Sequence, residues 1–187
     1  CASTPISACG RPAALRWYAD LMAEALPPVG SDPVVRELAQ RLTKEADTTE
    51  AKVRAIHAYA AKQIRYVGLE FGIHSLKPHA VREVIDRRFG DCKDKATLLV
   101  ALLAEVGVPA QVVLVRTSDL GGLADPVASL GVFNHAIAWV PALNWWLDAT
   151  APFHLPGELP TGDHGGTVIR VPLLPLRPGE VADNAPL

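Results

Sequence analysis

Apolar residues recur at helical spacing in the N-terminal part of the chain and predict a series of helices. Residues 12–26 are rich in Ala and Leu, and Pro27 marks the end of a first helix because proline cannot continue it. Asp32 followed by Pro33 is typical of an N-cap with proline at the first helical position, so a second helix is expected there. The apolar positions of this helix are Val34, Val35, Leu38 and Leu42.

A third helix is expected to begin near Asp47, because Asp47 and Glu50 resemble a capping box. Residues 64–71 alternate poorly between apolar and polar and contain two glycines, which indicates an extended segment or loop. Residues 80–87 predict a further short helix. One face of the third helix carries Val53, Ile56, Ala60 and Ile64.

The next predicted helix follows a turn at Gly90. Asp91 is placed to cap it, so that Cys92 falls in its first turn. Residues 98–104 form an unbroken apolar run, and Gly107 ends the helix. Because this helix is apolar nearly all round, we expect it to be central and buried.

Alternation of apolar and polar residues then replaces helical spacing, which predicts strands at 111–116, 132–140 and 145–148. Residues 117–130 form a loop, and 168–174 are compatible with another strand. The second and third strands make a hairpin, and helices followed by antiparallel strands indicate an α+β fold. We expect an N-terminal helical segment at 1–47, a core at 48–171 and a Pro-rich tail at 172–187.

Composition narrows the classes of function. The chain has 187 residues, a formal net charge of −2 and no long run of Lys or Arg, so nothing favours nucleic acid as a partner. The longest apolar run is far too short for a membrane span. The three cysteines form no CxxC pair or Cys/His cluster, which gives no indication of structural zinc, and the other histidines lack ligand-like spacing.

Three residues far apart in the sequence fit a nucleophilic site. A cysteine attacks as its thiolate, and a helix N-terminus and a nearby imidazolium both favour that form, so Cys92 is the expected nucleophile. His135 lies on one arm of the predicted hairpin and is the expected base and acid. Asp148 ends the other arm and is the expected carboxylate that orients the imidazole.

Such a site also needs donors for a developing oxyanion. The backbone N–H of Cys92 is the first expected donor. Gln63, Tyr66 and His74 are candidates for the second, while Tyr66 is alternatively a packing residue beside the helix. Residues 93–95, which flank the nucleophile, are expected to form a solvated or salt-bridged helix start, or to fix the loop before Cys92 through Asp94.

These segments resemble the bacterial transglutaminase-like superfamily over residues 48–171. The run GDCKDKATLL at 90–99 is the specific signature, and NHA at 134–136 and WLDAT at 146–150 are similar to the His and Asp motifs. IRYV at 64–67 and GELP at 157–160 resemble the branch found between two β-rich domains in larger envelope proteins. The resemblance implies a papain-like core with Cys92, His135 and Asp148 as the triad.

The implied reaction is acyl transfer from an amide of a protein or peptide through an acyl-enzyme, with water or an amine as acceptor. No cofactor is expected, and calcium dependence is not indicated. The resemblance also implies an exported or envelope setting and neighbouring β-rich domains in a longer chain, although the residues alone leave the location open. Two alternatives are a non-catalytic module that binds a peptide or domain in the cleft, and a metal site of Cys92, His135 and Asp148.

Overall fold

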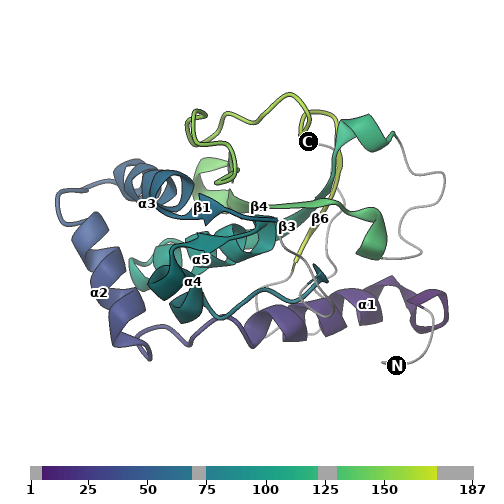
Figure 1. The fold of residues 1–187 in the computed structure, drawn as a ribbon, viewed down its shortest axis with the longest axis horizontal. Coiled ribbons are helices and arrows are strands. Elements are labelled where there is room, and N and C mark those ends of the chain that lie inside the picture. Colours follow the sequence, from purple (N-terminus) through teal and green to yellow (C-terminus); the bar gives the residue numbers. More distant parts are fainter. Residues whose placement is uncertain (1–5, 69–74, 122–129, 172–187) are drawn as a thin grey trace.

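The computed structural model describes residues 6–68, 75–121 and 130–171, and it has the predicted helices followed by an antiparallel sheet (Figure 1). The helices are α1 (Ile6–Ala23), α2 (Pro33–Leu42), α3 (Thr49–Gln63), α4 (Val81–Arg87) and α5 (Cys92–Glu105). The strands are β1 (Arg65–Tyr66), β2 (Phe89–Gly90), β3 (Gln111–Arg116), β4 (His135–Val140), β5 (Trp145–Leu147) and β6 (Thr167–Arg170).

The local signals for the helix starts are largely confirmed. Asp32 caps α2 by accepting hydrogen bonds from the backbone N–H groups of Val34 and Val35. The predicted cap of α3 at Asp47 is wrong by one residue: Thr48 has the extended backbone of an N-cap, and its hydroxyl accepts from Ala51 N. Helix α1 begins and ends earlier than predicted, at Ile6 and Ala23.

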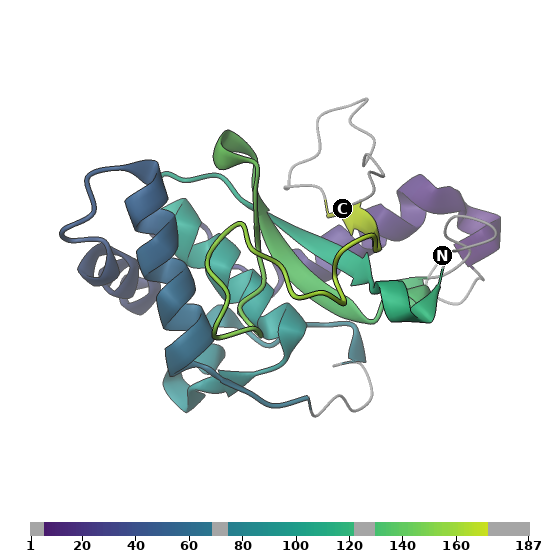
Figure 2. The same ribbon diagram turned by 90° about the horizontal axis from the view of Figure 1, so that it is seen from above.

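Helix α5 is the centre of the fold. All twelve residues from Cys92 to Leu103 are buried, as expected from its apolar sequence. Helices α2, α3 and α4 pack against it, and β3 and β4 cover it from the side of the sheet (Figures 1 and 2). The N-terminal end of α5 is therefore held between the helical layer and the sheet.

The larger sheet has the strand order β5-β4-β3-β6, and all its neighbours are antiparallel. The predicted hairpin is confirmed: β4 pairs with β5 in the register Trp139 opposite Trp146, across a turn at 141–144. The inner face of the sheet joins the core around α5. The outer face has a small cluster of its own, built on Val113, Val115, Ile137 and Val168.

The main core crosses residue 47, because Tyr18 and Met22 of α1 and Val35 and Leu38 of α2 belong to the same buried cluster as α5. The division of the chain at 47/48 stays a prediction. Within the ranges given above, no helix combines the length and apolarity that crossing a membrane demands.

Candidate active site

A reciprocal capping box fixes the start of α5, and with it the position of Cys92. The Asp91 carboxylate accepts from Asp94 N at 3.1 Å, and the Asp94 carboxylate accepts from Asp91 N at 3.2 Å. Arg87 and His79 hold Asp94 from outside, through an ion pair and a backbone hydrogen bond at 2.8 Å. The expectation that Asp94 fixes the turn before Cys92 is thus confirmed.

The residues that flank Cys92 are salt-bridged, but they are not solvated. Lys93 forms an ion pair with Asp91, and both are buried. Lys95 is fully buried and donates from Nζ to the carbonyl of Ile64 at 2.8 Å, which ties α5 to the end of α3. Burial lowers the pKa of Lys95 to about 8, although the charge of Asp148 opposes this. Sequence reasoning missed this burial because lysine is seldom enclosed without a partner.

Gly90 is required by close packing against the capping box. A Cβ at this position would lie 2.7 Å from the Cβ of Asp94 and 2.9 Å from its Oδ2. We expect Gly90→Ala to destabilise the protein by about 1–3 kcal/mol, because the overpacking displaces Asp94. Urea unfolding measures the loss. Gly162→Ala is the matched control, since a Cβ there meets nothing within 4 Å, and an equal loss in both variants would contradict the prediction.

The two-stranded parallel sheet brings β1 beside the turn that precedes α5. Tyr66 pairs with Gly90, and the N–H of Val67 donates to the carbonyl of Gly90 at 3.0 Å. Tyr66 therefore lies close to the nucleophile end of α5, with 49% of its surface exposed. Gln63 is exposed at the last residue of α3, and His74 lies outside the described residues. The identity of the second oxyanion donor stays a prediction.

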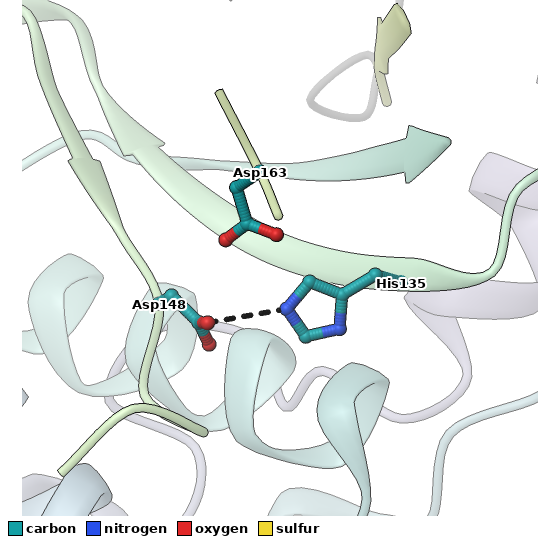
Figure 3. A group of neighbouring side chains, drawn as sticks. All are labelled: His135, Asp148 and Asp163. Carbon is teal, nitrogen blue, oxygen red and sulfur yellow. Dashed lines mark ion pairs between the residues drawn. The ribbon is translucent and has the colours of Figure 1, made fainter. Parts of the chain in front are cut away.

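His135 and Asp148 meet as the hairpin predicted. The Nε2 atom of His135 lies 3.3 Å from Oδ2 of Asp148 in an ion pair (Figure 3), and both side chains are largely enclosed. His135 begins β4, and Asp148 directly follows β5. Continuing the register of β4 and β5 places residue 148 opposite residue 137. His135 lies two positions before residue 137, so His135 and Asp148 are diagonal neighbours across the hairpin.

The thiol of Cys92 is the second partner of His135. Burial by itself lowers the pKa of His135, but hydrogen bonds to Asp148 and to Cys92, with the negative charges of both groups, raise it to about 10. Because Nε2 faces Asp148, Nδ1 is the ring nitrogen left for the sulfur. Cys92 is a free thiol with 7% of its surface exposed. The three predicted residues are therefore brought together, with His135 as the common neighbour of the thiol and the carboxylate.

Asp148 is held on several sides. Its Oδ1 accepts from the N–H of Thr150 at 2.8 Å and from the Thr150 hydroxyl at 2.7 Å. Burial alone raises the pKa of Asp148, but the hydrogen bond and charge of His135, with the Thr150 bonds, leave it below its ordinary value. From α3, buried His57 donates from Nε2 to the Asp148 carbonyl at 3.2 Å, and burial lowers the pKa of His57. Asp148 is thus an ionised carboxylate in a fixed orientation.

Two supporting residues were not predicted. His57 had a signal, since it lies beside Ile56 on the apolar face of α3, where a buried histidine needs a polar partner. Asp163 had none, because it is a lone acid in a loop rich in Gly and Pro. One carboxylate oxygen of Asp163, one of Asp148 and a ring nitrogen of His135 all lie within 4.8 Å of one another, and Figure 3 shows the three side chains together.

The comparisons with known proteins agree with this geometry. A sequence model of the transglutaminase-like superfamily matches residues 36–147, which include Cys92 and His135 and end one residue before Asp148. The crystal structure of a candidate protease from Parabacteroides distasonis is 18% identical, with a TM-score of 0.62 over 86% of this chain and 29% of that chain. A candidate cysteine protease from Cytophaga hutchinsonii is 21% identical, with a TM-score of 0.49 over 70% of this chain and 42% of that one. No curated protein matches the sequence.

The chain spans less than half the length of either solved structure. At these identities the Parabacteroides protein shows that the α+β fold is shared, and it shows no more than that. The family match is stronger, because it covers more than half of the chain and contains the signature run around Cys92. The chain belongs to the transglutaminase-like superfamily.

Proposed function

We propose that the chain catalyses cysteine-dependent acyl transfer from an amide of a protein or peptide, with Cys92, His135 and Asp148 as the catalytic triad. The observation that carries the proposal is the position of His135, whose ring is hydrogen-bonded to a thiol on one side and to a carboxylate on the other. A thiol at a helix N-terminus beside an imidazolium is the arrangement in which the thiolate is stabilised.

The proposed reaction begins with attack of the Cys92 sulfur on the amide carbonyl. The N–H groups in the first turn of α5 have no partner within the helix, so the N–H of Cys92 can donate to the developing oxyanion. His135 gives its proton to the leaving nitrogen as the C–N bond breaks, which leaves a thioester at Cys92. His135 then takes a proton from water or from an amine as that acceptor attacks the thioester. Water as the acceptor makes the enzyme a peptidase or amidase, and an amine as the acceptor makes it a transglutaminase.

Three further observations support the proposal. Asp148 is ionised and faces Nε2 of His135, so it fixes the tautomer and orientation of the ring. The capping box holds the nucleophile end of α5 in place. Membership of the transglutaminase-like superfamily and the fold shared with the Parabacteroides protein agree with a role like that of a cysteine protease. The hypothesis of a non-catalytic binding module does not explain why His135 contacts both a thiol and a carboxylate.

Alkylation by iodoacetamide tests whether Cys92 is activated. We expect Cys92 to react faster than a free thiol at neutral pH, because a helix N-terminus and a neighbouring imidazolium both favour the reactive thiolate. Peptide mapping by mass spectrometry separates the Cys92 adduct from adducts at Cys1 and Cys9, and free cysteine in the same solution is the reference thiol. His135→Ala should bring Cys92 to the slow, pH-dependent rate of an ordinary thiol. A Cys92 that is already slow in the unmodified protein would favour the binding module.

The acceptor is identified by incubating the protein with a peptide library and a primary amine. We expect a mass increase on the peptide that contains Cys92, which corresponds to the acyl-enzyme. Products joined to the amine then indicate a transglutaminase, and free carboxylic acids indicate a peptidase or amidase. Cys92→Ser provides the matched control, since its weaker nucleophile should give no acyl adduct under the same conditions.

A further inference from the structure

The carboxyl group of Asp163 is enclosed beside the His135–Asp148 pair. Only 4% of the Asp163 surface is exposed, and its Oδ2 is a buried atom that has no hydrogen-bond partner among the described residues. An ionised carboxylate in that position leaves a desolvated charge next to the carboxylate of Asp148, which is strongly unfavourable. The imidazolium of His135 already pairs with Asp148, so a further charge on Asp163 calls for a proton or another cation.

The loop that carries Asp163 is closely packed. The N–H of Asp163 donates to the carbonyl of Pro160 at 2.9 Å, and the N–H of Gly166 donates to the carbonyl of Asp163 at 3.2 Å. A Cβ at Gly166 would lie 2.7 Å from the carbonyl oxygen of Arg116 and 3.1 Å from that of Asp163, so the loop passes directly over β3. The loop cannot easily move Asp163 away from its two neighbours.

A shared proton accounts for this arrangement better than a cation. One oxygen of Asp163 and one of Asp148 lie within 4.8 Å of each other, and two buried carboxyl groups that close cannot both stay ionised without cost, so a proton on one of them relieves the repulsion. Burial raises the pKa of Asp163, and the charge and hydrogen bond of Asp148 raise it further. The charges of His135 and His164 act in the opposite direction and lower it. A metal ligand must be a neutral imidazole, whereas the ion pair with Asp148 favours the protonated ring of His135.

We propose that Asp163 is a fourth member of the site, a neutral carboxylic acid that donates a hydrogen bond to Asp148 and fixes its orientation toward His135. The effect of Asp163 on catalysis rests on the proposed function, whereas its protonation does not. Thr150 already occupies Oδ1 of Asp148 with two hydrogen bonds, and His135 faces Oδ2. The O–H of Asp163 gives the Asp148 carboxylate a further hydrogen-bond donor. Asp148 is then held by Thr150, His135 and Asp163 together. Asp163 is a positioning residue that acts on the thiol through Asp148 and His135.

Carbon-13 NMR of the aspartate carboxyl groups tests the proton directly and needs no catalytic activity. The Asp163 signal is assigned by its loss in Asp163→Asn. We expect its midpoint to lie clearly above the value of about 3.9 for a free aspartate, to fall in Asp148→Asn, and to be unchanged by EDTA. A midpoint at or below the ordinary value would overturn the proposal. So would a midpoint that EDTA shifts, because a cation would then hold the carboxylates.

Alkylation of Cys92 tests the positioning role. The amide of Asp163→Asn keeps a donor for Asp148, so this variant should react within about threefold of the unmodified protein. Asp163→Ala removes the donor and should react about 10- to 100-fold more slowly at neutral pH, as is typical of a misplaced catalytic group. Equal rates in the two variants would overturn the positioning role. If Cys92 of the unmodified protein is no faster than free cysteine, the proposed function fails, while the NMR titration still decides whether Asp163 holds the proton.

Discussion

Replacing His135 with Gln is expected to slow formation of the acyl-enzyme at Cys92 by about 10⁴-fold or more. The imidazole has two tasks in the proposed reaction: it stabilises the thiolate, and it supplies the proton that the leaving amine requires. Gln has nearly the same reach but neither accepts nor donates a proton in that way. Single-turnover mass spectrometry with a peptide amide found in the library experiment measures the rate of acylation.

His164→Gln is the control for this prediction. His164 is exposed, and its Nε2 donates to the carbonyl of Leu159. Among the described residues, no hydrogen bond or ion pair joins its ring to Cys92. We expect its acylation rate to stay within about threefold of the unmodified protein. A comparable loss in both histidine variants would mean that the assay reports general damage to the fold.

The second large effect is expected for Asp148→Ala, which should lower the acylation rate by about 10³- to 10⁴-fold. Removing the carboxylate leaves His135 enclosed without the partner that raises its pKa most strongly, so the imidazolium should lose its proton well below pH 10. Nitrogen-15 NMR of the ring follows this midpoint, and the alkylation profile of Cys92 should move with it. Asp86→Ala is the control, because this exposed acid pairs with Arg82 on the surface and is expected to change neither quantity.

The same ion pair determines a pH window for stability. The pKa of Asp148 is lowered on folding, so its contribution is present above its ordinary value and is lost as the pH falls through the lowered one. The pKa of His135 is raised, so its contribution is complete below its ordinary value of 6.5 and is lost as the pH rises toward 10. An unchanged pH dependence of unfolding in Asp148→Ala would contradict this pairing.

The triad could be predicted because each member carried a local signal. Gly90 and Asp91 placed Cys92 at a helix start, and alternating apolar residues placed His135 and Asp148 on the two arms of one hairpin. Those signals depend on backbone geometry over a few residues, which sequence patterns describe well. The central position of α5 followed in the same way from its continuous apolar surface.

The supporting residues depend on contacts between distant segments, and patterns along the chain do not describe those. Lys95 reaches the carbonyl of Ile64, 31 residues away, and His57 reaches that of Asp148, 91 residues away. Asp163 lies in a loop whose path is determined by packing of its backbone against β3. The role of each of these side chains depends on its burial between the helices and the sheet. That burial is known only once the three-dimensional structure is known.

The complete burial of α5 also has a consequence for how the site comes apart. Amide hydrogens along a helix enclosed by both layers exchange only when the whole domain unfolds, whereas the loop beyond Asp148 is tied down mainly by turns and by the short strand β6. Cys92 therefore belongs to the most enclosed element of the part of the chain that the structure describes. Local opening elsewhere would leave the nucleophile in place at the end of an intact helix.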